Sequence, residues 1–289
     1  MTAEPTAKPS PTPAADSASG QDEPAPESFF YADGDAVMPT QLAASPWGPV
    51  LHGRMSGGLA ARAVEQVLAE DPDLICTRLT IDMFKSAPLA PMRTSTKTIR
   101  SGRRITVLEV TVEQDRGPIA QGKFLLLRRS AQPEGTYRQT PGWEAPAPGP
   151  QLGPPTRTDG PGLDGATAGH RWRAPHQSWR VNNGRSGPES VGTWVRDVYP
   201  LVAGEELTPL VRLGLAGDLA SGEANTSDRG LHFINADYTI YLGRELQGEY
   251  IGLQPYGHVS DRGVAIGQCV VHDEQGPVGF IATTALANT

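Results

Sequence analysis

The sequence has 289 residues, enough for one large or two ordinary domains with an ample hydrophobic core. Its formal net charge of −7 and pI of about 5.4 argue against binding to nucleic acid or to an anionic membrane. No apolar run approaches the ~20 residues of a membrane span, and the N-terminus has no apolar stretch of the secretory kind, so we expect a soluble, cytoplasmic protein.

Residues 1–27 are rich in Pro, Ala, Ser and Thr and show no hydrophobic periodicity. Such a composition cannot bury enough apolar surface to offset its ordering entropy, so we predict a disordered tail. Residues 29–47 are typical of two short strands around a turn. A helix with one apolar stripe follows, with Ser56 as a candidate cap and a stop at Asp71-Pro72.

The rest of the chain alternates between strand patterns and one further helix. Strands are predicted in the first half at about 75–86, 91–100, 103–115 and 118–129. Strands are predicted in the second half at 176–181, 191–202, 230–243, 249–259, 263–273 and 277–287. Between the halves, residues 140–168 are too rich in Pro and Gly for regular elements, and we interpret them as a linker.

The second helix carries an acidic residue in an unfavourable place. Thr208 followed by Pro209 is a helix start, and Gly222 marks the predicted end. Asp218 therefore faces the negative end of the helix dipole, where a carboxylate needs a partner or a function. Taken alone, a solvated surface Asp is the simpler interpretation.

The two halves are copies of one unit. At a fixed offset of 159 residues, TID at 80–82 meets TIY at 239–241, and the strand hydrophobic register matches without gaps from about 77 to 128. Each unit is predicted to wrap a curled antiparallel sheet around one long helix, and two such units would pack as a pseudo-dimer. We place the N-terminal unit at 28–139 and the C-terminal unit at 169–289.

The chain also resembles a known family. The strings YADGDAVMPTQLAASPWGP, HGRMSGGLAARAVE, PLVAGEELTPL, FINADYTIYLGREL and DEQGPVGFIATTAL are similar to those of actinobacterial thioesterase-like proteins, which in turn resemble acyl-CoA thioesterase II. The resemblance covers about 29–129 and 172–287. It implies an α+β fold, a double hotdog of two tandem units.

The resemblance further implies a catalytic water held by an Asp, a polar group on the next strand and a Gln on the last strand. Matched by position, these fall on Asp218, Asn235 and Thr284, so that a shorter hydroxyl replaces the Gln. Thr283 is the candidate if the strand register slips by one residue. Catalytic roles for Asp218, Asn235 and Thr284 are thus expected from the family.

The duplication supports a pocket at these positions. At the 159-residue offset the three polar residues oppose Leu59, Cys76 and Leu125, which are all apolar. Solvated faces would be polar in both copies, so the asymmetry indicates one polar pocket and one filled pocket. Cys76 and Cys269 are interpreted as buried small hydrophobic residues.

Substrate contacts are predicted near the first helix. Unpaired amides at a helix N-terminus can stabilise an oxyanion, and Gly57 and Gly58 are the candidates, although a tight helix entry explains them equally well. His52 could line the pocket, or could be a loop histidine without a role.

The substrate is expected to be an acyl-CoA or an acyl carrier protein. Turn arginines (Arg103, Arg104, Arg262) could contact CoA phosphates, or could simply be solvated. No cofactor is expected beyond the CoA or phosphopantetheine of the substrate, and the six histidines lack zinc-ligand spacing. The oligomeric state stays open between a monomer and a homo-oligomer.

The leading hypothesis is an acyl thioesterase of lipid or polyketide metabolism. The alternative is a non-hydrolytic hotdog protein that binds an acyl or polyketide-like intermediate, as a cyclase or dehydratase would in secondary metabolism. The Gln-to-Thr change motivates that alternative, but the segment after Asp218 offers no histidine for a dehydratase. A third, weaker hypothesis is a purely structural pseudo-dimer.

Overall fold

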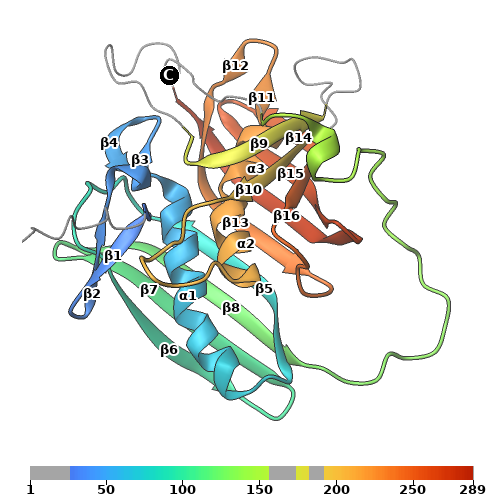
Figure 1. Cartoon of the computed structure of the whole chain (residues 1–289), viewed down its shortest axis with the longest axis horizontal. Coiled ribbons are helices and arrows are strands. Elements are labelled where there is room, and N and C mark those ends of the chain that lie inside the picture. The colour runs from blue at the N-terminus through green and yellow to red at the C-terminus, as the bar shows by residue number, and fades with distance from the viewer. Residues whose placement is uncertain (1–26, 156–173, 182–191, 289) are drawn as a thin grey trace, which may run out of the picture.

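The computed structural model describes residues 27–155, 174–181 and 192–288 (Figure 1). The first part contains β1 (Phe30–Asp33), β2 (Ala36–Pro39), η1 (Gln41–Ala43), β3 (Ala44–Ser45), β4 (Gly48–Leu51), α1 (Gly53–Glu70), β5 (Leu74–Met83), β6 (Arg93–Ser101), β7 (Ile105–Gln114), β8 (Gly117–Arg128) and η2 (Pro150–Leu152). The second part contains β9 (His176–Val181), β10 (Gly192–Asp197), α2 (Pro209–Gly217), α3 (Leu219–Ala224), β11 (Thr226–Ser227), β12 (Gly230–Leu231), β13 (Phe233–Leu242), β14 (Ile251–Asp261), β15 (Val264–Asp273) and β16 (Gly276–Ala287).

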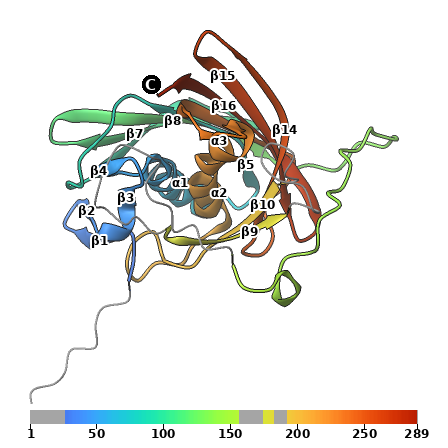
Figure 2. The same cartoon turned by 90° about the horizontal axis from the view of Figure 1, so that it is seen from above.

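One antiparallel sheet runs through both units. Its strand order is β6-β7-β8-β5-β13-β16-β15-β14-β10-β9, so the β5–β13 pair joins the two halves. The sheet curls around the helices; α1 and α2 lie side by side inside the curve, and α3 continues from α2 (Figure 2). This arrangement is the predicted double hotdog, and the fold prediction is confirmed.

The predicted duplication is visible strand by strand. The bounds of β5, β7 and β8 recur 159 residues later in β13, β15 and β16. The β5–β8 and β13–β16 pairs even carry equivalent bulges, at Cys76/Arg78 and Asn235/Asp237. At the centre, Thr80 pairs with its own counterpart Thr239, and their hydroxyl oxygens are 3.0 Å apart. A pseudo-twofold axis therefore passes through this pair.

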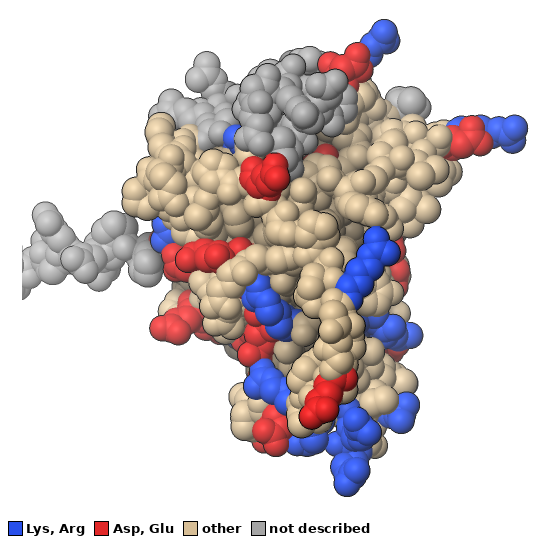
Figure 3. All heavy atoms as spheres, turned by 90° about the vertical axis from the view of Figure 1, so that its right-hand side faces the viewer, with Lys and Arg blue, Asp and Glu red and all other residues tan. Residues whose placement is uncertain are grey.

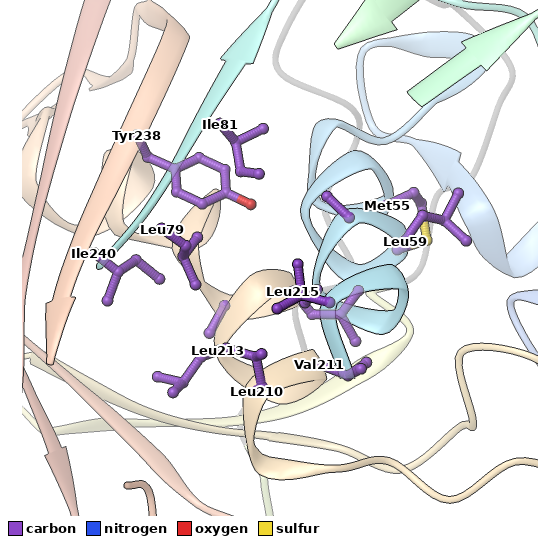
Figure 4. Packing of buried hydrophobic residues seen from close by; sticks show 14 of the residues in the cluster. Met55, Leu59, Leu79, Ile81, Leu210, Val211, Leu213, Leu215, Tyr238 and Ile240 are labelled. Atoms are coloured by element: carbon purple, nitrogen blue, oxygen red, sulfur yellow. The ribbon is translucent and has the colours of Figure 1, made fainter. Parts of the chain in front are cut away.

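The two helices cross at glycines on the same axis. A Cβ atom on Gly57 would lie 2.4 Å from the Gly214 carbonyl oxygen, and one on Gly214 would lie 2.5 Å from that of Gly57. The buried Tyr238 hydroxyl points toward the helices (Figure 4) and donates to the Gly214 carbonyl at 2.7 Å. Only residues without side chains allow this approach, so the helical crossing depends on both glycines.

Helix boundaries differ slightly from the prediction. α1 begins at Gly53 rather than near Ser56, with His52 as its N-cap, because the chain leaves β4 only one residue earlier. Thr208 caps α2 as predicted, and its side chain accepts a hydrogen bond from the Val211 amide. The helical path is interrupted at Asp218, between α2 and α3, and continues to Ala224 rather than ending at Gly222.

Part of the predicted linker packs on the second unit. The indole of Trp194 donates to the Pro146 carbonyl, and that of Trp179 donates to the Gly153 carbonyl. Trp143 stacks near Trp194 with ring centroids 5.0 Å apart. The tail at 1–26, the remainder of the linker and Trp172 lie outside the described residues, and the division at 28–139 and 169–289 stays a prediction.

The remaining sequence expectations concern surface and cysteines. Charged side chains of both signs are interspersed on the face in Figure 3, in keeping with a modest net charge. Cys76 and Cys269 are both free and buried, as predicted. No helix within the described ranges is long and apolar enough to cross a membrane.

Candidate active site

Asp218 is buried in the interior of the molecule, at the break between α2 and α3. Only 9% of the residue is exposed, so the solvated interpretation is wrong. Its Oδ1 accepts a hydrogen bond from the Asn235 amide at 2.7 Å, and its Oδ2 lies 3.1 Å from His52 Nδ1. The fold thus brings together residues from the α2–α3 junction, β13 and the α1 N-cap.

The neighbours of Asp218 keep it ionised. Burial raises the pKa of this carboxyl, but hydrogen bonding and charge from His52, hydrogen bonding from Asn235 and the positive charge of Arg54 lower it by more. The net result is a pKa below the ordinary Asp value of 3.8. A buried carboxylate held in its basic form is suited to accept a proton or to orient a water.

The His52 ring has two neighbours at one nitrogen. Nδ1 is 3.1 Å from Asp218 Oδ2 and 3.4 Å from the Arg54 amide nitrogen. The shorter contact requires Nδ1 to carry a hydrogen, which it donates to the carboxylate. His52 therefore acts on Asp218 as a donor.

A second set of charges lies directly behind this pair. Arg54 is fully buried and forms an ion pair with Asp197, in which its Nη2 donates to the two carboxylate oxygens at 2.7 and 2.8 Å. Its guanidinium also lies 3.2 Å from His176 Nδ1 and 5.8 Å from the Phe29 ring centroid. Burial, together with the charges of Arg54 and His52, lowers the pKa of His176 well below 6.5, so this ring is neutral. The cluster joins α1 to β9 and β10 next to the site.

Asp218 lies where two cavities meet. One, the β9 pocket of about 280 Å³, lies among α3, β9 and β10 and includes His176, Arg180, Thr193 and Glu223 in its lining. The other, the α1 pocket of about 310 Å³, is lined by the N-terminus of α1 and the end of β5. Both share the following lining residues: Trp47, His52, Asp218 and Asn235. A ligand could therefore occupy both pockets with its reacting centre at Asp218.

Thr284 does not join this group. Its side chain is exposed, and its hydroxyl donates to Asp237 Oδ1 at 2.5 Å on the outer face of the sheet. Thr283 points inward instead, is 1% exposed and lies 3.4 Å from Asn225 Nδ2. The family resemblance placed the third polar residue at Thr284, whereas the inward-facing threonine of this strand is Thr283. Neither threonine lines a pocket that contains Asp218.

For Gly57 and Gly58 the contacts favour the tight-packing interpretation over the substrate contact. Gly57 contacts Gly214 and Tyr238, and a Cβ on Gly58 would lie 2.8 Å from Leu215. These glycines permit helix packing, whereas Gly53 lies at the site. A Cβ on Gly53 would come 2.9 Å from Asp218 Oδ1, so this residue brings the first amides of α1 close to the carboxylate.

The turn arginines lie outside the lining of both pockets. Arg103, Arg104 and Arg262 are exposed in the turns before β7 and β15, and none lines either cavity. Within the described ranges, no group of three or more His, Cys, Asp or Glu side chains could hold a metal ion.

The interface between the two units has a second pocket at its other end, of about 470 Å³, which is the counterpart of the α1 pocket. Ile75, Cys76 and Leu242 line it, at positions equivalent to Ile234, Asn235 and Met83 of the α1 pocket. Because the helices cross at Gly57 and Gly214, the residue equivalent to Asp218 is the buried Ala61 rather than Leu59. With this corrected pairing, two of the three predicted polar positions still oppose a buried apolar residue. Asp218 opposes Ala61, and Asn235 opposes Cys76.

Sequence reasoning missed the two basic partners. His52 was a candidate for pocket lining but not for contact with Asp218, and Arg54 was not considered. Neither residue has a sequence spacing to Asp218 that predicts the contact, because the two units must pack before α1 and α2 meet. A histidine therefore lies beside Asp218, although the segment after Asp218 offers none.

Comparisons with known proteins agree with this architecture. The family model described as acyl-CoA thioesterase N-terminal domain matches residues 43–126, and the model described as acyl-CoA thioesterase C-terminal domain matches residues 143–286. No curated protein sequence matches the chain.

Several solved structures share the fold. A proposed thioesterase from Novosphingobium aromaticivorans has a TM-score of 0.65 at 16% identity, covering 90% of this chain and 99% of its own. Acyl-CoA thioesterase II TesB2 from Mycobacterium marinum has a TM-score of 0.56 at 13% identity, covering 89% and 93%. A hotdog-fold protein of unknown function from Alicyclobacillus acidocaldarius has a TM-score of 0.61 at 13% identity, covering 90% and 96%.

These low identities show the fold alone, whereas the two family models together span most of the sequence. The chain therefore belongs to the acyl-CoA thioesterase family and carries its N-terminal and C-terminal domains in tandem.

Proposed function

We propose that the protein hydrolyses an acyl-CoA thioester with a water activated by Asp218. The observation that supports this most strongly is the buried, ionised carboxylate at the junction of two pockets. One pocket can accept the acyl group and the other the pantetheine arm, which places the thioester beside Asp218. An acyl carrier protein would present the same phosphopantetheine arm, and we keep it as an alternative donor.

The proposed water has two acceptors. It donates one hydrogen to Asp218 and the other to the Asn235 side-chain oxygen, whose amide nitrogen is already committed to Asp218. The water attacks the thioester carbonyl carbon while Asp218 takes its proton. The C–S bond then breaks, and the leaving thiolate receives that proton. The products are a free acid and CoA thiol.

The carbonyl oxygen gains negative charge during attack and needs a donor. The Gly53 amide, the first of α1, has no acceptor within the helix and lies at the positive end of its dipole. We assign the oxyanion site to this helix end rather than to Gly57 and Gly58. Preorganised donors of this kind typically contribute about 10²–10³ in rate.

The absence of the family Gln is consistent with this scheme. Asn235 and His52 hold the carboxylate from two sides, so its orientation does not depend on a residue of β16. Thr284 has no role in the proposed reaction.

The test is thiol release from a series of acyl-CoA chain lengths by wild type and Asp218→Asn. We expect wild type to release thiol and Asp218→Asn to lose most of that rate. The matched control is Asp228→Asn, an exposed carboxylate in the turn between β11 and β12. Equal, slow release by wild type and Asp218→Asn would contradict a hydrolase.

One observation favours a second candidate function, dehydration of a 3-hydroxyacyl thioester. The 3.1 Å contact of His52 with Asp218 provides a base and an acid in one site. His52 would remove the α-proton while a protonated Asp218 gives a proton to the departing hydroxyl, forming an enoyl thioester and water. Formation of enoyl-CoA without thiol release would support this reaction, but the lowered pKa of Asp218 disfavours it.

A further inference from the structure

Two buried polar atoms in the β9 pocket lack hydrogen-bond partners. Glu223 Oε2 and Thr193 Oγ1 are both shielded from solvent and form no hydrogen bond of normal geometry among the described residues. Both residues line the pocket that contains Asp218. A buried polar group without a partner is destabilising, so a polar ligand that pairs with it is favoured at that place.

No residue around Glu223 donates a hydrogen bond of normal geometry to its Oε2 among the described residues. Its other oxygen, Oε1, is 3.8 Å from Arg180 Nη2, beyond hydrogen-bonding distance. Burial raises the pKa of this carboxyl, and the charge of Arg180 and the nearby Thr193 hydroxyl offset that only in part. A ligand that donates a hydrogen bond to Glu223 would therefore be strongly favoured.

The two atoms without partners, Glu223 Oε2 and Thr193 Oγ1, favour a ligand that carries a hydroxyl group. A hydroxyl can donate to the Glu223 carboxylate and accept from the Thr193 hydroxyl at the same time. An ammonium group would be repelled by the Arg180 guanidinium of the same pocket, and a carboxylate or phosphate would be repelled by Glu223. A simple alkyl chain would leave both atoms unsatisfied.

The position of the pair fixes where that hydroxyl belongs. Glu223 follows Asp218 by five residues, a rise of about 7.5 Å along a helix, so the hydroxyl lies several carbons beyond the thioester. The acyl group is assigned to this pocket by charge. The α1 pocket contains Lys85 and, apart from Asp218, no acidic side chain, which suits the anionic CoA arm better.

We propose that the β9 pocket binds a hydroxyl group carried on the distal part of the acyl chain, through Glu223 and Thr193. This inference rests on the proposed function, and it narrows the substrate class to hydroxylated acyl thioesters.

The test compares hexanoyl-CoA with ω-hydroxyhexanoyl-CoA, which differ only in the distal hydroxyl. For wild type we expect kcat/KM to be higher for the hydroxylated substrate by about tenfold or more, because its hydroxyl satisfies both buried groups. Glu223→Gln and Thr193→Val should each bring that ratio down toward one. Glu274→Gln, an exposed glutamate, is the matched control and should keep the wild-type ratio.

Three results would overturn the proposal. Wild type could show no preference for the hydroxylated substrate. The variants could retain the preference. The variants could also lower kcat/KM equally for both substrates, which would place Glu223 and Thr193 on the CoA arm. Thermal melts verify that each variant is folded.

Failure of the hydrolase itself is a separate result. If wild type releases thiol from no acyl-CoA, binding of the same two compounds to wild type and Glu223→Gln is measured by calorimetry. Tighter binding of the hydroxylated compound to wild type, lost in Glu223→Gln, would support the polar pocket without hydrolysis. Equal binding of both compounds to wild type would overturn it.

Discussion

At the scale of single residues, the site depends on how His52 and Asn235 hold Asp218. Both partners donate hydrogen bonds to the carboxylate and favour its charged form against the opposing effect of burial. Asn235 was predictable because the family motif places it on the strand after the helix. His52 was not, because its contact depends on the docking of α1 against the α2–α3 junction.

Removal of His52 should change the pH dependence of the reaction. In wild type the pKa of Asp218 is lowered, so the base stays ionised and kcat/KM should be level from pH 7 to about 5. In His52→Leu, burial acts with less opposition and the pKa of Asp218 rises, so the acid limb of the profile should move to higher pH. The measurement is a pH profile of kcat/KM for one acyl-CoA.

The control for this shift is His232→Leu, at an exposed histidine that lines neither pocket. It should leave the profile unchanged. An unshifted acid limb in His52→Leu would show that His52 does not act on the ionisation of Asp218.

The two neighbouring threonines of β16 provide a second test at this scale. Thr284→Val should keep kcat/KM within about twofold of wild type, because the side chain is exposed on the outer face. Thr283→Val should lower the free energy of unfolding by about 1–2 kcal/mol, because it removes a buried hydroxyl beside Asn225. Denaturant titration and thiol release distinguish them. A large loss of activity in Thr284→Val would restore its predicted catalytic role.

At the scale of elements, the helix crossing determines where the site forms. Gly57 and Gly214 let α1 and α2 approach closely enough for the α1 N-terminus to reach Asp218. The sequence indicated two helices and a glycine pair, but it could not distinguish a ligand contact from a helix contact. A glycine is needed for a ligand contact and for a close helix contact alike. The positions of Tyr238 and α2 in the fold show that these glycines serve the helix contact.

Substitution at the crossing should therefore destabilise the fold. A Cβ in Gly57→Ala would lie 1.6 Å from the Tyr238 hydroxyl and 2.4 Å from the Gly214 carbonyl. We expect a loss of about 3 kcal/mol in the free energy of unfolding, since backbone atoms must move. The measurement is equilibrium unfolding in urea.

Gly222→Ala is the matched control, because its Cβ would meet no atom closer than 3.9 Å. It lies within α3 and should be neutral or stabilising by up to about 1 kcal/mol. Equal stability of Gly57→Ala and wild type would show that the helices do not need the close approach.

At the scale of the whole molecule, the duplication has produced two related pockets, one at each end of the interface between the units, and different residues line them. One end carries Asp218 and Asn235, and the equivalent positions at the other carry Ala61 and Cys76. The duplication, the double hotdog and the polar asymmetry were all predictable, since a fixed offset preserves strand register along the chain. The buried Arg54–Asp197 pair was not, because it joins α1 of one unit to β10 of the other.

This asymmetry predicts that one end alone catalyses hydrolysis, and the most direct measurement is kcat for acyl-CoA thiol release by two variants. Asp218→Asn should lower kcat by about 10²–10⁴, as expected for loss of a general base. Glu65→Gln changes an acidic residue of the counterpart pocket and should retain the wild-type kcat. A wild-type rate in Asp218→Asn, or a comparable loss in Glu65→Gln, would contradict a single active site centred on Asp218.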